Sequence, residues 1–315
     1  MQGLRFIPSG TSIPFTRFRM VGLVVSSILV LASLFLFFTV DLNYGIDFRG
    51  GTLIEIRTKD GPANLGNLRS QLGSIGLGDV QIQEFGDPSE VLIRIEQQAG
   101  GEENQQRSIQ LVKDTLGDTV DYRRVEVVGP TVSGELIQSG TIAVITAILA
   151  VLVYIWFRFE WQFAIGAVAA LVHDVVLTIG IFSMLQLEFN LSIIAAILTI
   201  VGYSLNDTVV VFDRIRENLR KFKKMELSEL VDLSLNETLS RTALTSVTTL
   251  LALGSLYIFG GEVIRGFTFA MIWGVVVGTY SSIFVASPVL LMLGVNRERG
   301  GSPSPKPKEP ALRRT

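Results

Sequence analysis

The sequence predicts an α-helical polytopic membrane protein with six transmembrane helices and one small α+β domain outside the membrane. Of its 315 residues, 48% are hydrophobic and only 18% are charged, which is more apolar than a soluble globular protein. Six apolar runs are long enough to cross the hydrocarbon core as helices. A polar stretch of about 90 residues, enough for one small core, separates the first run from the second.

The first apolar run covers residues 20–40 and follows a short polar segment, 1–19, which ends in Arg17 and Arg19. A secretory signal peptide is the alternative interpretation, because it also joins a basic start to an apolar stretch. This run is too long for a signal-peptide core, and no A-x-A-type cleavage site follows Phe38. We therefore predict an uncleaved transmembrane helix over 20–40.

Residues 41–133 have the composition of a soluble domain, and the spacing of their apolar residues predicts six elements. Alternation of apolar and polar residues predicts strands, and spacings of three and four predict helices. The predicted elements are a strand at 52–57, a helix at 62–75, strands at 80–85 and 91–95 joined by 86–88, a helix at 102–116 and a strand at 120–128. This β-α-β-β-α-β order is typical of a ferredoxin-like sandwich.

The predicted helix bundle, residues 134–295, contains the other five spans, at 137–156, 162–185, 191–212, 233–259 and 267–293. Lys and Arg in short loops decide orientation. One set of loops holds Arg158 and the cationic run 214–224, whereas the opposite loops hold only Arg265. We predict that both termini are cytoplasmic and that 41–133 lies outside. The tail 296–315, rich in Pro, Lys and Arg, is predicted to be disordered.

Composition argues against several classes of function. The 27 Lys and Arg are balanced by 29 Asp and Glu and are not gathered on one folded domain, so no nucleic-acid partner is indicated. The chain has no cysteine and a single histidine, His173, which argues against disulfides and against Cys or His metal sites. It lacks a phosphate-loop motif and the common hydrolase motifs. We expect no catalytic site, no metal and no cofactor.

Three ionisable residues, Asp174, Asp207 and Arg241, lie inside predicted spans, where one charge near the centre costs roughly 3 kcal/mol. Counted from the outer helix ends, Asp207 and Arg241 both lie roughly 25 Å from the outer surface, and Asp174 about 17 Å. A carboxylate and a guanidinium at equal depth on consecutive helices can pair. We predict that Asp207 and Arg241 do so.

The fifth span carries a polar stripe, because five residues on it share one helical face. They are Glu237, Arg241, Thr245, Thr248 and Thr249. Such a stripe indicates a wet or protein-facing seam, and Asn206 adds further polar groups beside Asp207. Two interpretations stay open: a proton or ion relay, or a static pair with hydroxyl groups that only pack helices.

Two smaller features have simpler interpretations. His173 stands beside Asp174 and either supports the polar site or hydrogen-bonds a neighbouring carbonyl group. Gly274-x-x-x-Gly278, near the end of the chain, predicts close packing between helices.

Several motifs resemble the SecF family of bacterial protein-export membrane proteins. Besides Gly-Ile-Asp-Phe-Arg-Gly-Gly-Thr at 45–52, they lie at 172–174, 202–208, 213–218, 240–242 and 259–261. The motif at 45–52 alone would not separate SecF from its partner SecD. The motif of the fourth span and the single small outer domain favour SecF. The resemblance covers about 17 to 295, in order.

The resemblance implies a six-span half of a twelve-span unit of the resistance-nodulation-division superfamily, with SecD as the other half. It implies a multi-pass protein of the bacterial inner membrane with a periplasmic domain at 41–133. Its expected role is to assist export of unfolded polypeptides through the SecY-SecE-SecG channel, which the SecA ATPase drives, by using the proton-motive force. The insertase YidC is a further candidate partner.

Residue by residue, Asp207 and Arg241 match positions that the family associates with proton conduction, so protons are the expected coupling ion. Asn206, Asp174, His173, Glu237 and Thr245 are the expected supporting polar residues. Two other classes remain as alternatives. A proton-coupled small-molecule exporter predicts a much larger outer portion, and a non-transporting translocon scaffold predicts tolerance of Asp207→Asn.

Overall fold

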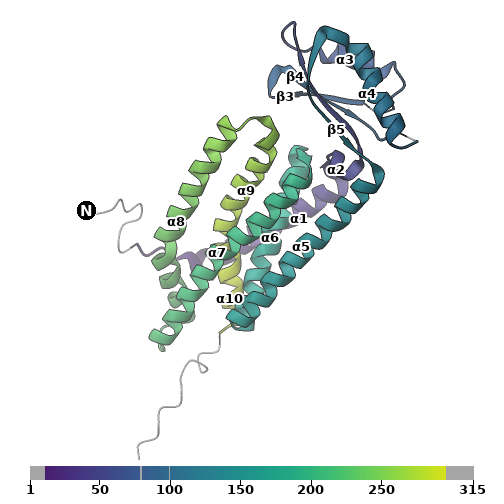
Figure 1. The fold of residues 1–315 in the computed structure, drawn as a ribbon. Coiled ribbons are helices and arrows are strands. Elements are labelled where there is room, and N and C mark those ends of the chain that lie inside the picture. Colours follow the sequence, from purple (N-terminus) through teal and green to yellow (C-terminus); the bar gives the residue numbers. More distant parts are fainter. Residues whose placement is uncertain (1–10, 79, 99, 296–315) are drawn as a thin grey trace, which may run out of the picture.

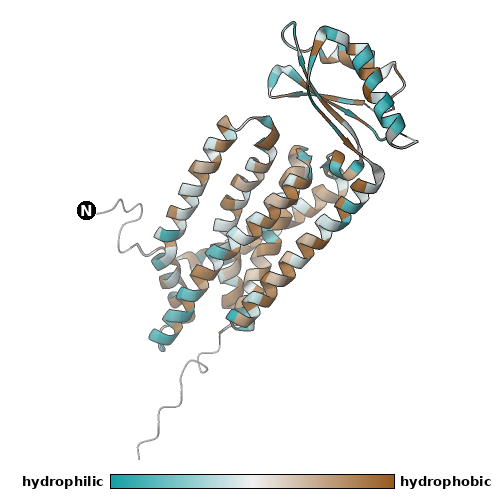
Figure 2. Cartoon of the chain, in the orientation of Figure 1, coloured by the Kyte–Doolittle hydropathy of each residue, from teal (hydrophilic) through white to brown (hydrophobic). Residues whose placement is uncertain are grey.

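The computed structural model describes residues 11–78, 80–98 and 100–295, so the predicted tail 296–315 lies outside the described residues. Six helical segments are long and apolar enough to cross a membrane, as predicted. They form an elongated bundle with a small domain at one end (Figure 1). Apolar residues dominate the middle of these helices, and polar residues gather at the two ends of the molecule (Figure 2).

The helices of the bundle are longer than the apolar runs that predict them. They are α1 (Arg19–Val40), which follows the short turn η1 (Phe15–Phe18), then α5 (Pro130–Arg158), α6 (Trp161–Leu185), α7 (Leu191–Lys221) and α8 (Leu227–Phe259). Helix α7 continues beyond its predicted end at residue 212 because its last turns pack a second, smaller apolar face, including Ile215, against Leu230 of α8. Charged residues on the other face of these turns hide this continuation in a hydropathy profile.

The last span is one predicted helix but three observed segments. It consists of α9 (Arg265–Ser281), the π-helical turn η4 (Ser282–Ala286) and α10 (Ser287–Leu293), preceded by the short turn η3 (Glu262–Ile264). Pro288 explains the interruption, because its ring excludes the carbonyl of residue 284 and it has no N–H to donate. The hydroxyl of Ser287 donates instead to the carbonyl of Ser282, at 3.0 Å.

The outer domain is a four-stranded sheet with two helices on one face. Its elements follow the order predicted from the sequence. They are β2 (Gly51–Thr58), α3 (Leu65–Gly73), β3 (Val80–Phe85), β4 (Asp87–Ile95), α4 (Glu102–Leu116), the turn η2 (Gly117–Thr119) and β5 (Val120–Val128). The strands lie in the order β3-β4-β2-β5, and all neighbours are antiparallel. The hairpin turn is tighter than the predicted 86–88 segment, because Gly86, at φ 82°, reverses the chain almost alone.

One face of the sheet forms the core of the outer domain. Ile54, Ile56 and Ile93 are fully buried there against Leu72 of α3 and Val112 of α4. The opposite face turns toward the bundle, where Leu53 and Leu92 pack on Ile46 of the short helix α2 (Ile46–Arg49). The sheet therefore has one face for its own core and one for the membrane part.

Two short strands that the sequence does not predict join the outer domain to the bundle. They are β1 (Asn43–Tyr44), directly after α1, and β6 (Glu188–Phe189), in the connection between α6 and α7. They pair in parallel, with Asn43 opposite Glu188 and Tyr44 opposite Phe189. Elements of two residues leave no periodic pattern, so only the tertiary structure reveals them.

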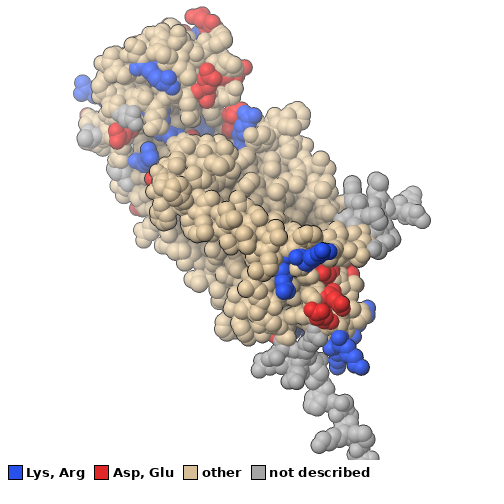
Figure 3. Space-filling view, turned by 180° about the vertical axis from the view of Figure 1, so that it is seen from behind, with Lys and Arg blue, Asp and Glu red and all other residues tan. Residues whose placement is uncertain are grey.

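Charged residues are concentrated at the two ends of the molecule (Figure 3). Between them lies a broad surface of uncharged residues on the face shown. Phe15 of η1 and Leu290 of α10 belong to one apolar cluster at the end opposite the outer domain. Both ends of the described chain are therefore on that side of the bundle.

Small residues bring α1 and α6 into close contact. A Cβ atom added to Gly180 of α6 would collide with Ser33 of α1, including its Cα atom at 2.8 Å. Gly254 of α8 offers a matched control, because an added Cβ atom would meet nothing within 4 Å. In a membrane, close approach of this kind supplies the dispersion energy of helix association.

We expect Gly180→Val to force α1 away from α6 and to destabilise the protein by about 1–3 kcal/mol, the usual cost of overpacking. Gly254→Val, also in a transmembrane helix, should leave stability nearly unchanged. Thermal unfolding of both purified variants in the same detergent measures the difference. Equal midpoints for the two variants would contradict the α1–α6 contact.

Candidate functional site

Two buried carboxylates, Asp174 and Asp207, lie inside the bundle. Asp174 is 1% exposed on α6, and Asp207 is 5% exposed on α7. Close packing of α7 against α9 supports both positions. A Cβ atom on Gly278 of α9 would lie 3.0 Å from the Cβ atom of Ser204, and one on Gly274 would collide with Ile200. The close helix packing predicted from the Gly274-x-x-x-Gly278 spacing is therefore confirmed.

Asp174 has hydrogen-bond partners on both carboxylate oxygens. Its Oδ1 lies 2.9 Å from Nδ1 of His173. Its Oδ2 accepts from the hydroxyls of Ser204, at 2.5 Å, and of Ser281, at 2.8 Å. Asp174 therefore joins α6, α7 and α9 through side chains that would otherwise be unsatisfied in an apolar bundle.

His173 extends this network toward α1. Its ring stacks on Tyr280, with centroids 6.1 Å apart, and the Tyr280 hydroxyl contacts Ser26 and the carbonyl of Gly22. The other ring nitrogen of His173, Nε2, is buried without a hydrogen-bond partner among the described residues. His173 therefore pairs with Asp174, rather than with a backbone carbonyl, and keeps one free nitrogen.

Asp207 is only half satisfied. Thr242 of α8 donates its hydroxyl to Oδ1 at 2.9 Å. The second oxygen, Oδ2, is buried and has no partner within the part of the chain that the structure describes. Because an unpaired carboxylate oxygen is costly inside a membrane, this atom is the one to which a proton or a partner's donor would bind.

The predicted contact ion pair between Asp207 and Arg241 is wrong for this chain taken alone. Among the described residues, the partner of Asp207 is Thr242 and not Arg241, whose side chain is exposed. The prediction considered how deep Arg241 lies in the membrane but not the direction in which its side chain points. Successive residues on a helix point about 100° apart. The next residue, Thr242, is therefore the one that faces Asp207.

The polar stripe predicted on α8 faces outward from the chain, not into the bundle. Glu237, Arg241 and Thr245 are all exposed, although Glu237 accepts from Asn218 of α7 at 2.8 Å. Asn206 is exposed as well, on the neighbouring helix α7. Four hydroxyl residues at spacings of four form the inward row instead: Ser234, Thr238, Thr242 and Ser246. Their regular spacing in the sequence could have indicated this inward row, but the row that contains the charged residues Glu237 and Arg241 is more conspicuous.

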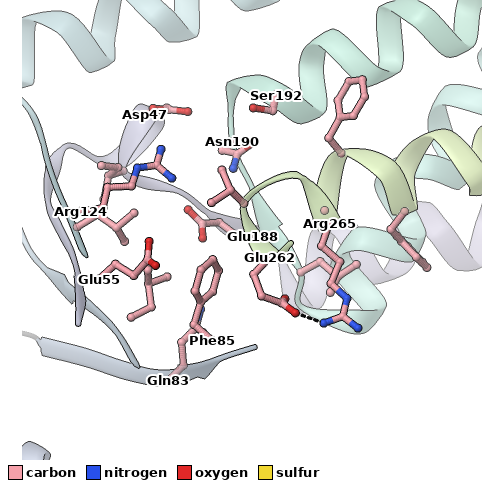
Figure 4. Close-up of a pocket in the computed structure, with 18 of the residues that line it drawn as sticks. Asp47, Glu55, Gln83, Phe85, Arg124, Glu188, Asn190, Ser192, Glu262 and Arg265 are labelled. Carbon is pink, nitrogen blue, oxygen red and sulfur yellow. Dashed lines mark hydrogen bonds and ion pairs between the residues drawn. The ribbon is translucent and has the colours of Figure 1, made fainter. Parts of the chain in front are cut away.

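The outer domain contacts the bundle at the outer end of α7 (Figure 4). Asp47 of α2 accepts the backbone N–H of Leu191, the first residue of α7, at 2.8 Å. Beside it, Arg94 of β4 forms an ion pair with Glu188 at 3.1 Å and donates to Asn43 at 3.2 Å. A carboxylate at a helix N-terminus satisfies a free N–H group and favours the helix dipole. The helix that carries Asp207 is therefore attached at its outer end to the linker of the outer domain.

A hollow of about 430 Å³ lies between the bundle-facing side of the sheet and the outer ends of the bundle helices. Strand residues such as Phe85 and Glu55 line one side, and Glu262 and Arg265 line the other (Figure 4). The hairpin turn at Gly86 rests on the Glu262 side chain, which forms an ion pair with Arg265. The domain thus touches the bundle in two places, with the hollow between them.

The described residues contain no group of three or more His, Cys, Asp or Glu side chains arranged to hold a metal ion. Together, the fold and these sites define a polytopic membrane protein with two buried carboxylates in its bundle and an outer domain attached to the helix that carries one of them.

Comparison with known proteins identifies the family. Residues 108–296 match the family described as protein export membrane protein SecD/SecF, C-terminal, and residues 35–61 match the SecD/SecF GG motif. The chain is 48% identical to the protein translocase subunit SecF of Rickettsia rickettsii, over 94% of this chain and 96% of that one. For SecF of Vibrio alginolyticus the identity is 47%, over 91% of both chains. This chain belongs to the SecD/SecF family of protein-export membrane proteins.

Solved structures agree with the sequence comparison. The crystal structure of SecDF from Thermus, a translocon-associated membrane protein, matches with a TM-score of 0.81 and 34% identity over 90% of this chain. A second structure, SecDF in a super-membrane-facing form, matches with a TM-score of 0.65 and 33% identity over 92% of this chain. In both cases this chain spans 39% of the solved one.

The Glu188 contact should make stability depend on pH. Burial raises the pKa of Glu188 above its ordinary value of 4.5, although the charge of Arg94 acts in the opposite direction. The folded protein therefore binds this proton more tightly than the unfolded chain does. The contribution of Glu188 to stability is greatest below pH 4.5 and is lost as the pH rises through the raised pKa.

We expect Glu188→Gln to remove this part of the pH dependence, so that its unfolding midpoint falls less than that of the original protein as pH rises from 4.5 toward neutrality. Asp118→Asn, which removes an exposed carboxylate of the outer domain, is the control. Thermal unfolding in one detergent across this pH range tests the prediction. Parallel curves for Glu188→Gln and the original protein would refute it.

Proposed function

We propose that this chain is the SecF-type half of a SecD–SecF complex that assists Sec-dependent protein export by using the proton-motive force. In this proposal a proton that crosses the membrane part moves the outer domain. The observation that carries it is the free Oδ2 of Asp207, buried in a membrane helix whose outer end Asp47 caps.

Proton uptake at Asp207 changes the forces on α7. The ionised carboxylate accepts a hydrogen bond from the Thr242 hydroxyl. Protonation removes the negative charge and weakens this hydrogen bond. Each charge that crosses 100 mV carries about 2.3 kcal/mol, enough to shift a two-state equilibrium by nearly two decades.

A shift of α7 reaches the outer domain through three contacts at its outer end. They are the Asp47 cap on Leu191, the pairing of β1 with β6 and the Arg94–Glu188 ion pair. All three connect the start of α7 to segments continuous with β2 or β4 of the sheet. The outer domain then moves relative to the bundle and acts on an emerging unfolded polypeptide.

Exposed polar groups in the membrane part support a second half. Arg241 and Thr245 of α8 and Asn206 of α7 are exposed in the membrane part, where lipid cannot satisfy the charge of Arg241 or the amide of Asn206. A SecD-type bundle would cover them and supply donors and acceptors. The solved SecDF chains, of which this chain spans 39%, are consistent with that arrangement.

The remaining assignments follow from this role. The outer domain is a ferredoxin-like sandwich in the periplasm. The protein spans the bacterial inner membrane, and both of its termini lie in the cytoplasm. The SecY-SecE-SecG channel, the SecA ATPase and YidC are the further partners. The two SecDF structures match this chain with different TM-scores at nearly equal identity, which supports more than one arrangement within the family.

We expect Asp207→Asn and Arg241→Met, each with SecD present, to abolish proton flux and to reduce export to its level without a proton-motive force. Glu229→Gln, which removes an exposed carboxylate of α8, should retain both activities. Export into inverted vesicles and proton flux into proteoliposomes are the measurements. Undiminished export in both membrane variants would favour a translocon scaffold over the relay.

Movement of the outer domain can be tested by a disulfide between Gly86→Cys and Glu262→Cys, because these two residues are in contact. The chain has no cysteine of its own, so no background thiol interferes. Oxidation should block export, and reduction should restore it.

Two controls accompany this disulfide. Each single cysteine variant reports the effect of replacing Gly86, which has a positive φ, or Glu262. The pair Arg57→Cys and Glu90→Cys links β2 to β4 at directly opposite positions, within the outer domain, and should not affect export. Full export with the Gly86–Glu262 link closed would exclude the proposed motion.

A further inference from the structure

A second hollow, of about 470 Å³, lies at the opposite end of the molecule from the outer domain. It lies where α5 ends, α6 begins and the last turns of α7 extend past the apolar part of the bundle. Six residues line it and define what we call the basic hollow: Arg158, Asp213, Arg216, Glu217, Arg220 and Lys221. None of them takes part in the contacts of Asp174 or Asp207.

The two carboxylates of the basic hollow are already neutralised. Asp213 accepts from Nη2 of Arg158 with both of its oxygens, at 2.7 and 3.0 Å. Glu217 accepts from Arg214, at 2.9 Å, a residue outside the lining. Neither carboxylate is left to balance the other cations.

Three cations of the basic hollow have no carboxylate partner within the described part of the chain. Arg216 donates to a neutral acceptor, the carbonyl oxygen of Arg158, at 3.2 Å. Arg220 is one helical turn farther along the same face of α7, and Lys221 lies against the ring of Phe222. The basic hollow therefore carries net positive charge on donor groups suited to a phosphate.

Aromatic side chains place the basic hollow at the level of lipid headgroups. Trp156 and Phe157, at the end of α5, are 64% and 87% exposed, and Trp161, at the start of α6, is 52% exposed. Exposed tryptophan at the end of a membrane helix is typical of the boundary between hydrocarbon and water. Two of the three tryptophans of the chain are thus close in sequence to Arg158, which lines the basic hollow.

We propose that the basic hollow binds the phosphate headgroup of an anionic phospholipid, whose acyl chains lie against the exposed apolar side of α5. Arg216 and Arg220 contact the phosphate, and Arg158 is held in place by Asp213. Basic pockets between membrane helices are known to select anionic lipids in this way. The exposed apolar residues Leu149 and Val153 of α5 continue the surface from the aromatic residues into the bilayer.

Brominated lipids, which quench tryptophan fluorescence on contact, test this proposal. In a Trp273→Phe background only Trp156 and Trp161 remain, and both are close in sequence to Arg158 of the basic hollow. We expect brominated phosphatidylglycerol to quench them at a lower mole fraction in nanodiscs than brominated phosphatidylcholine. Arg216→Gln with Arg220→Gln should reduce this preference by roughly fivefold for each charge removed.

Lys223→Gln with Lys224→Gln is the matched control, because it removes two cations from the same end of the chain but outside the basic hollow. It should leave the preference nearly unchanged, and inorganic phosphate at millimolar concentration should not displace the lipid. Equal losses in the two double variants would show unspecific charge attraction. Displacement by free phosphate would assign the hollow to a soluble anion.

If an acidic protein surface occupied the basic hollow instead of a lipid, the two double variants would give a different result. In that case Arg216→Gln with Arg220→Gln would weaken co-purification with SecD or the channel while the lipid preference remained intact. This outcome would overturn the lipid proposal. Unfolding midpoints of both double variants, measured in the same nanodiscs, exclude loss of the fold as the cause.

Discussion

A carboxylate inside an apolar helix bundle needs hydrogen-bond donors, and much of this bundle is arranged around the way Asp174 finds them. His173 supplies one donor from the same helix, and Ser204 and Ser281 supply two from α7 and α9. Those hydroxyls reach Asp174 only because small residues, including Gly278, let α7 and α9 approach closely. The close packing and the satisfied charge therefore depend on each other.

Asp207 has the opposite character, although it lies on the same face of α7 as Ser204, one turn away. It has one donor, Thr242, and one free buried oxygen. In a low-dielectric environment a fully hydrogen-bonded carboxylate is stabilised by its donors, whereas an unpaired carboxylate oxygen is costly. The bundle thus contains one fully hydrogen-bonded carboxylate, Asp174, and one that is half satisfied, Asp207.

Helix α7 links the two ends of the molecule. At its outer end Asp47 caps it and the Arg94–Glu188 ion pair lies beside it, and at its other end Arg216 and Arg220 project into the basic hollow. Asp207 lies between these ends. Any movement of this helix would change its contacts with the outer domain at one end and with the membrane surface at the other. The lipid proposed to bind in the basic hollow would resist or guide such a movement.

From the sequence alone, composition and periodicity determined the six spans and the order of the outer-domain elements, because hydropathy and side-chain spacing are local properties. The motifs also pointed correctly to the family. The short strands β1 and β6, the interrupted last span and the Asp47 cap needed the tertiary structure, because they depend on contacts between distant segments. The largest difference between the prediction and the structure concerns α8. The depth of its polar residues in the membrane was predictable, but the direction in which their side chains point was not. Only the packing of α8 against α7 decided that Thr242 faces Asp207 and that Arg241 faces outward.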